Sequence, residues 1–152
     1  MIEKLQNQEI EVSRQIRSVF QLSYAVEAVL LKATDFPPLK RPLESFLESR
    51  NVFFGYIENE ELAGVVEVEL NKDSTGIRSL VVCPKYFRRG IGRALVQFVF
   101  DEFDAELFVV ETGVDNGPAI ELYKKLGFKE VKQWDTDIGI RKVKFERHVF
   151  QR

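Results

Sequence analysis

Residues 77–95 combine an apolar stretch, arginines and glycines in an order that could bind a phosphate group. The β-branched, apolar residues 77–83 predict a buried strand, and Pro84 ends it because proline cannot donate a ladder hydrogen bond. Apolar residues then recur at three- and four-residue spacing, as on one face of a helix. A helix N-terminus presents unpaired backbone N–H groups, and glycines let an anion approach them closely. The candidate anion-binding residues at this junction are Arg88, Arg89, Gly90, Ile91, Gly92 and Arg93.

Two nucleotide-binding patterns are excluded at this junction. Position 95 is Leu95, so the dinucleotide pattern G-x-G-x-x-G that begins at Gly90 is incomplete. No Gly-Lys-Ser or Gly-Lys-Thr follows, so the P-loop pattern is absent as well. The glycines and arginines therefore indicate a phosphate-containing ligand other than these nucleotides. The alternative is an ordinary strand-to-helix connection with a basic rim.

A second group of polar residues lies on a predicted helix near the C-terminus. Asn116, Ala119 and Tyr123 are spaced over about two helical turns, so they line one side of that helix. Gly127 follows the last turn and fits the C′ position of a helix end. Considered separately, Asn116 fits an ordinary N-cap and Tyr123 fits a core tyrosine. Because both lie on one side of the helix, we favour the interpretation that they contact one ligand.

Both stretches resemble the motifs of the GNAT superfamily of acyl-CoA-dependent N-acetyltransferases. The first, Val82-Cys83-Pro84 followed by Tyr86 and the arginine–glycine run, resembles the motif that binds the pyrophosphate of coenzyme A. The second, residues 116–128, resembles the family pattern N-x-x-A-x-x-x-Y-x-x-x-G-F. One position departs from the family pattern: Phe87 stands where Gln or Arg is usual.

The resemblance implies a role for each matching residue. The arginine–glycine run would hold the pyrophosphate, and Asn116 would hydrogen-bond the pantetheine or bind near the thioester. The central strand would separate from its neighbour, so that the backbone of Leu80, Val81 and Val82 could bind pantetheine and the thioester carbonyl. A backbone N–H aimed at that carbonyl stabilises the developing oxyanion. Tyr123 would protonate the leaving thiolate, which a phenol of pKa about 10 can do because it is not ionised beforehand.

The attacking amine must lose a proton to a base or to a chain of waters, and three carboxylates are candidates for the base. Glu111 is the first, because its spacing to Asn116 resembles the branch of the family that acetylates protein N-termini. Glu67 and Glu69, on a strand beside the site, are the second. Each also fits a solvated strand end. A covalent route through Cys83 is disfavoured, because no histidine is near it in the sequence to activate the thiol.

The resemblance also indicates which segments select the acceptor. In the family these are the first two helices with their loop, and the final hairpin, which here are residues 24–41 and 133–140. Aromatic and acidic residues in them could receive a cationic amine. They are Asp35, Phe36, Trp134, Asp135 and Asp137.

The periodicity predicts one mixed α/β (α+β) domain over residues 1–152, with about six strands and four helices in a mostly antiparallel sheet. The predicted helices are residues 9–32, interrupted near Ser23, and 43–48, 90–103 and 118–126; the predicted strands are 52–57, 62–70, 77–83, 106–112, 129–134 and 140–149. Residues 1–7 are predicted to be frayed, so the strand with which the GNAT superfamily commonly begins would be absent or very short here. The apolar residues predicted to face the core from the first helix are Val12, Ile16, Val19, Phe20, Val26, Val29 and Leu30.

Composition narrows the class of protein. The 152 residues suit one domain, and 22 basic against 24 acidic residues provide no global field for nucleic acid or an anionic membrane. A single cysteine and a single histidine, Cys83 and His148, disfavour a metal site. With no secretory or membrane-length apolar segment, we expect a soluble, cytoplasmic protein.

The sequence therefore predicts a transferase that moves an acetyl group from acetyl-CoA to a primary amine by direct attack in a ternary complex. The acceptor would be a small molecule, a peptide N-terminus or a lysine. Two alternatives remain: a GNAT-fold module that senses CoA without turnover, and an unrelated α/β domain. A homodimer through an exposed strand near the C-terminus is a further hypothesis.

Overall fold

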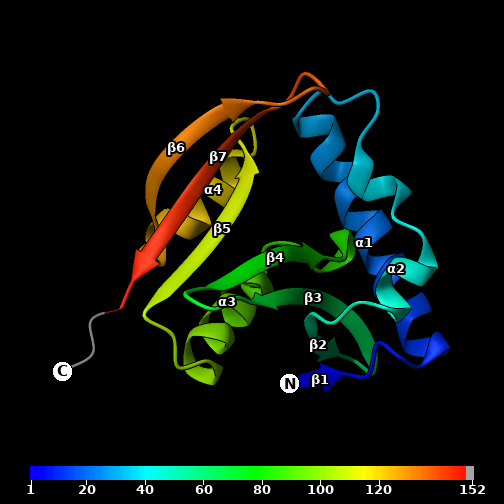
Figure 1. The fold of residues 1–152 in the computed structure, drawn as a ribbon. Coiled ribbons are helices and arrows are strands. Elements are labelled where there is room, and N and C mark those ends of the chain that lie inside the picture. Colours follow the sequence, from blue (N-terminus) through cyan, green and yellow to red (C-terminus); the bar gives the residue numbers. More distant parts are fainter. Residues whose placement is uncertain (150–152) are drawn as a thin grey trace.

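The computed structural model describes residues 1–149 and shows a seven-stranded sheet with helices on both faces (Figure 1). The strand order is β1-β2-β3-β4-β5-β7-β6, and every neighbouring pair is antiparallel except β4 with β5. The strands are β1 (Ile2–Leu5), β2 (Val52–Glu58), β3 (Glu61–Leu70), β4 (Thr75–Val82), β5 (Leu107–Gly113), β6 (Lys129–Asp135) and β7 (Arg141–His148). The helices are α1 (Ile10–Leu30), α2 (Leu43–Leu47), α3 (Ile91–Glu102) and α4 (Gly117–Lys125), with 3₁₀ turns η1 (Pro37–Lys40) and η2 (Pro84–Tyr86). The predicted mixed, mostly antiparallel architecture is confirmed.

The seventh strand is β1, in a segment that we predicted to lack regular structure. It pairs with β2, with Leu5 opposite Phe53, and Leu5 is buried in the core. Behind it, Asn7 is also buried, and its Nδ2 donates to the carbonyl oxygen of Phe46 at 2.7 Å. The prediction was wrong because a four-residue strand is too short to show a period of its own, and the partner strand supplies its stability.

The sheet divides the core into two apolar clusters, as alternation along the strands requires. On one face, α1 and α2 pack against the sheet; the buried residues there are Leu5, Ile16, Val19, Phe20, Phe46, Phe53, Val65 and Val81. On the other face, α3 and α4 pack; their cluster includes Val66, Val68, Leu95, Val99, Phe108, Tyr123 and Phe145. Helices therefore pack on both faces of the sheet.

Helix α1 is continuous, and its C-terminal half faces the core with different residues from those predicted. The helix runs through Ser23 without a break. Val26, Val29 and Leu30 are 37%, 77% and 42% exposed, whereas Ala28 and Leu31 are buried. Apolar residues occur all around this part of α1, so spacing alone could not identify the packed face, which is decided by the strands beneath it.

The connections follow from local sequence. The β2–β3 turn places Asn59 and Glu60 at φ 50° and 65°, the left-handed pair that two-residue hairpin turns need. Pro37 and Pro38 begin the 3₁₀ turn η1, as the fixed φ of proline allows. Within residues 1–149, no helix is both long and apolar enough to cross a membrane. Strand β6 is an edge strand whose side chains are mostly exposed, and the homodimer hypothesis stays a prediction.

Candidate active site

The two halves of the sheet separate where β4 meets β5 (Figure 1). Parallel pairing joins only Thr75, Gly76 and Ile77 to the start of β5, and ends there. From Arg78 to the end of β4, the edge that would face β5 has no strand partner. A sheet edge buried without a partner is costly, so an interruption of this kind marks a position where a ligand's polar groups can bind the backbone.

The backbone of β4 presents alternate residues to this opening. The Cys83 N–H donates to the carbonyl oxygen of Ala63 on β3 at 2.7 Å, so by alternation Val81 also faces β3. Leu80 and Val82 then direct their N–H and C=O groups to the opposite, open edge. The Val82 N–H does so, since it donates to Ser23 Oγ of α1 at 3.3 Å. Of the predicted backbone contacts, two therefore face the opening and one faces the sheet.

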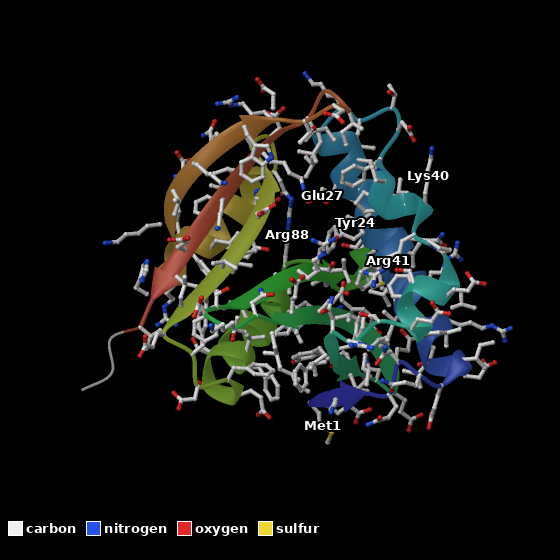
Figure 2. All side chains as sticks on the ribbon, viewed as in Figure 1. Met1, Tyr24, Glu27, Lys40, Arg41 and Arg88 are labelled. Atoms are coloured by element: carbon white, nitrogen blue, oxygen red, sulfur yellow. The ribbon has the colours of Figure 1, made fainter. Side chains whose placement is uncertain are left out.

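The predicted phosphate loop follows β4 and leads into α3. Gly90 has φ 76° and directly precedes the helix, a left-handed conformation that glycine adopts without strain. Arg88 also lies in that region, at φ 65°. The side chains of Arg88, Arg89 and Arg93 are exposed, and Arg88 is visible through the opening between β4 and β5 in Figure 2. Three exposed arginines thus lie within three residues of the start of α3, where an anion would be attracted.

A polar contact holds this loop to the sheet. Tyr86 is buried, and its hydroxyl donates to Glu61 on β3 at 2.6 Å. Lys85 forms an ion pair with the same carboxylate, and the hydrogen bonds from Lys85 and Tyr86 lower the pKa of Glu61. The Arg89 guanidinium lies 5.3 Å from the centre of the Tyr86 ring. Lys85 is therefore engaged within the protein, which leaves the arginines to face a ligand.

Asn116 and Tyr123 lie on α4 beside the opening. Asn116 is the N-cap of the helix, because its Oδ1 accepts from the Ala119 N–H at 3.3 Å. Its Nδ2 donates to Thr112 Oγ1 on β5 at 3.3 Å. Tyr123 is buried, packs edge-on against Phe128, and lines the same cavity as Asn116 and Ala119. Burial raises the pKa of Tyr123, so the phenol keeps its proton at neutral pH.

A cavity of about 1200 Å³ occupies the sheet face on which α1 and α2 pack. Its walls come from α1, the α1–α2 connection, β3, β4, β5, α4 and β7. The predicted residues that line it are Glu67, Glu69, Leu80, Glu111, Asn116 and Tyr123. The arginines of the phosphate loop do not line this cavity. The cavity therefore reaches the opening at Leu80, Asn116 and Tyr123, but it does not extend to the arginine loop.

The carboxylates proposed from the sequence differ in environment. Glu111 is exposed and stands opposite Lys144 in the β5–β7 register. Glu67, for which the other interpretation was a solvated strand end, is only 1% exposed. The sequence did not reveal this burial because the partners of Glu67 lie on other elements, out of reach of any local pattern.

Glu67 is instead the centre of a buried polar cluster. Its two oxygens accept hydrogen bonds from Arg41 at 2.7 and 3.0 Å, Asn51 at 2.9 Å and Ser79 at 2.9 Å. Burial pushes the pKa of Glu67 up, but these hydrogen bonds and the Arg41 charge outweigh it and lower the pKa. Arg41 also lies 4.0 Å from the ring centre of Phe46. The ion pair therefore fastens the α1–α2 connection to the sheet floor of the cavity.

Sequence reasoning missed Glu27 on α1, which projects toward the opening together with Tyr24 (Figure 2). Glu27 Oε1 accepts from Asn116 Nδ2 at 2.6 Å and lies 3.5 Å from Thr112 Oγ1. The signal was its position: it shares a helical face with Phe20, Tyr24 and Leu31, all of which line the cavity. A single carboxylate on an otherwise packed face is unusual and indicates a function.

The residues proposed to recognise the acceptor are mostly elsewhere. Phe36 lines the cavity and packs against Tyr24, with ring centres 5.8 Å apart. Asp35 pairs with Lys40, and Asp135 with Arg141 at 3.0 Å. The residues of this hypothesis that do not line the cavity are Asp35, Trp134, Asp135 and Asp137. Cys83 is half-buried and packs among the apolar residues of both clusters.

A separated central strand, an arginine-containing loop before a helix and a tyrosine beside the opening are the features that the resemblance implied. The model of the acetyltransferase (GNAT) family matches residues 16–128, and the chain belongs to this family. The predicted family is thereby confirmed.

Relatives agree with this assignment. The chain is 39% identical over 133 residues to the UPF0157 protein YqkA of Bacillus subtilis, a match that covers 87% of this chain and 39% of YqkA. It therefore spans about two fifths of that longer relative. It is 31% identical over 103 residues to the [ribosomal protein bS18]-alanine N-acetyltransferase of Escherichia coli K12, covering 65% of this chain and 69% of the relative.

Solved structures share the fold over the whole chain. The ribosomal-protein-S18-alanine N-acetyltransferase of Escherichia coli superposes with a TM-score of 0.78 at 22% identity, covering 100% of this chain and 95% of the other. The PaiA N-acetyltransferase of Thermoplasma acidophilum, solved in complex with coenzyme A, superposes with a TM-score of 0.73 at 17% identity, covering 98% and 99%. The predicted fold is thereby confirmed.

Proposed function

We propose that this protein transfers an acetyl group from acetyl-CoA to a primary amine by direct attack, without a covalent enzyme intermediate. The observation that carries the proposal is the opening between β4 and β5, where the free edge of β4 meets Asn116 and Tyr123. An acyl-CoA could reach it from the arginine loop and an amine from the cavity, which is the arrangement that a ternary complex needs.

The donor would be held by charge at one end and by backbone at the other. Arg88, Arg89 and Arg93, with the N–H groups of Gly90, Ile91 and Gly92, would bind the pyrophosphate. The open edge of β4 at Leu80 and Val82 would pair with the pantetheine amides, as an added strand does, with Val81 fixing the edge through β3. Asn116, already held by Glu27 and Thr112, would border the thioester.

Two groups would act on the thioester itself. The Val82 N–H makes only a 3.3 Å bond to Ser23 Oγ, and it would donate instead to the carbonyl oxygen as negative charge develops there. Tyr123 would give its proton to the departing sulfur, because its raised pKa keeps the phenol protonated at neutral pH. A module that only binds CoA needs no acid at this place, which favours an enzyme over a sensor.

The acceptor would be a primary amine on a small molecule, a lysine or a peptide N-terminus. The cavity of about 1200 Å³ exceeds the roughly 300–1,000 Å³ of ordinary small-molecule pockets, which favours a peptide. The names of two kinds of relative, N-alpha-acetyltransferase and [ribosomal protein bS18]-alanine N-acetyltransferase, support the same choice. Glu111, at the cavity wall, remains a candidate for the group that takes the amine proton.

Isothermal titration with acetyl-CoA and CoA tests the donor site. Arg89→Glu should weaken acetyl-CoA binding about tenfold or more, because it replaces an attractive charge near the pyrophosphate by a repulsive one. Arg14→Glu makes the same change on exposed α1 and should leave binding within about twofold. No binding by the unmodified protein would overturn the proposal.

A thiol-release assay over amines, lysine peptides and N-terminal peptides tests the reaction. Tyr123→Phe should lower kcat by about 10²-fold or more while acetyl-CoA binding is retained, since the ring and its packing are kept. Binding without turnover on every acceptor would favour a CoA sensor instead.

A further inference from the structure

Glu27 is a cavity carboxylate that has no role in the reaction described so far. It stands on α1, 89 residues from Asn116 in the sequence, yet its Oε1 accepts a 2.6 Å hydrogen bond from Asn116 Nδ2. Asn116 caps the helix that carries Tyr123. This bond therefore joins α1, which walls the amine side of the opening, to the residue that borders the thioester.

One oxygen of Glu27 is held and the other is open. Among residues 1–149, both hydrogen bonds to Glu27 end on Oε1, from Asn116 and Thr112. No buried side-chain oxygen or nitrogen in this part of the chain lacks a partner, so Oε2 is not sealed in the protein and faces the cavity. The carboxylate thus has a fixed orientation and a lone pair directed at the space where an acceptor would lie.

The surroundings of Glu27 suit an exchange of protons. Burial raises its pKa, and the hydrogen bonds from Asn116 and Thr112 with the Lys142 charge oppose that rise. The groups that face it are Tyr24 on its own helix, Thr112 on β5, Asn116 and Tyr123 at α4, and Lys142 on β7. A carboxylate with a raised pKa is a better base than one in water.

Two other carboxylates at the cavity, Glu67 and Glu111, are less suited. Both oxygens of Glu67 are occupied by Arg41, Asn51 and Ser79, and its lowered pKa makes it a poor proton acceptor. Glu111 is exposed, and no side chain among residues 1–149 fixes its orientation by a hydrogen bond or ion pair. Glu27 alone among them combines a fixed orientation with an open oxygen.

We propose that Glu27 is a catalytic residue that takes the proton from the acceptor's ammonium group; this rests on the proposed acetyl transfer. The proton passes from R–NH₃⁺ to Glu27 Oε2, and the freed nitrogen lone pair forms the C–N bond at the thioester carbon. The C–S bond then breaks, its electron pair leaves with sulfur, and the Tyr123 proton goes to that sulfur. The second proton lost by nitrogen returns to the Tyr123 oxygen, and Glu27 releases its own to solvent.

Glu27→Gln tests the proposal, because the amide oxygen of glutamine can still accept from Asn116. Loss of activity in this variant therefore reports the missing base rather than a displaced Asn116. We expect kcat/KM for the amine to fall about 100-fold or more at pH 7, with acetyl-CoA affinity by titration within about twofold of the unmodified protein. Glu11→Gln, the same change at an exposed position of α1, should alter neither quantity.

The pH profile separates chemistry from structure. In the unmodified protein kcat/KM should fall as pH drops through the Glu27 pKa, because the protonated carboxyl cannot accept a proton. In Glu27→Gln that dependence should vanish, and activity should recover as pH rises toward the pKa of the free amine, which then needs no base. A merely structural role would lower activity equally at every pH.

Each outcome decides a different statement. If the unmodified protein is active and kcat/KM of Glu27→Gln is within about threefold of it, the role of Glu27 is overturned and acetyl transfer is not. The same holds if Glu111→Gln lowers kcat/KM more than Glu27→Gln does. An unmodified protein that transfers no acetyl group to any amine overturns both.

Discussion

Replacing Arg41 by methionine should destabilise the fold through the charge that it leaves behind. Methionine keeps an apolar stem against Phe46 but removes the guanidinium that pairs with Glu67. The side chains of Glu67 and Arg41 are 1% and 21% exposed, so this is a buried carboxylate with a partly screened partner. Breaking a buried pair costs about 3–5 kcal/mol, and the exposure of Arg41 favours the lower end, about 3 kcal/mol.

The loss of stability in Arg41→Met should depend on pH in a defined direction. Because the pKa of Glu67 is lowered in the folded protein, its contribution to stability is present above the ordinary carboxyl pKa and is lost as pH falls through the lowered one. In Arg41→Met the carboxylate keeps only Asn51 and Ser79 as donors, so its pKa rises. The difference between the two proteins should therefore be largest near pH 7 and shrink in acid.

Urea unfolding followed by far-UV circular dichroism at neutral and acid pH measures this difference. Arg14→Met is the matched control, because the Arg14–Glu11 pair is 58% and 74% exposed and should cost less than about 1 kcal/mol. The double variant Arg41→Met/Glu67→Met should recover part of the loss, since no charge remains buried. Equal losses in Arg41→Met and Arg14→Met, or a loss that is independent of pH, would refute the reasoning.

Three further changes test the turn, the central strands and the α4 cap. Glu60→Gly should raise the free energy of unfolding by about 0.5–1 kcal/mol, because Glu60 has φ 65° in the β2–β3 turn; an unchanged or lower value in urea would contradict this. Gly64→Ala should lower the free energy of unfolding by about 1–3 kcal/mol, because a Cβ there would lie 2.9 Å from a methyl group of α3. Gly117→Ala is the control and should not destabilise, because nothing lies within 4 Å of its Cβ; equal effects of the two changes would rule out the clash. Asn116→Ala should cost about 1 kcal/mol as a lost N-cap and also lower kcat by more than its effect on acetyl-CoA affinity; stability loss alone would remove Asn116 from the active site.

Local sequence was enough to predict the two motifs and the elements that carry them. The glycine before α3 and Gly127 after α4 both adopt positive φ, at 76° and 91°, as their positions at helix ends require. Asn116 caps α4 because an amide side chain at that place satisfies a free helix N–H. These features depend on neighbours within a few residues, which is why spacing reveals them.

The predictions that were wrong, for residues 1–7 and for α1, have one cause in common. The residues 1–7 were predicted to be irregular, and β1 exists only because β2 pairs with it. The apolar residues of α1 cover more than one face, and the strands below decided that Leu31 is packed while Val29 is 77% exposed. In each case the deciding contact is with an element that is distant in the chain.

The sequence by itself determined the family, the order of strand, loop and helix around the donor site, and the candidates Asn116 and Tyr123. Only the tertiary structure decided the state of the carboxylates. Glu67 is buried because Arg41, 26 residues away, neutralises it, and Glu27 enters the cavity because Asn116, 89 residues away, holds one of its oxygens. The cost of burying a charge depends on partners that folding brings together, and no local pattern records which partners those are.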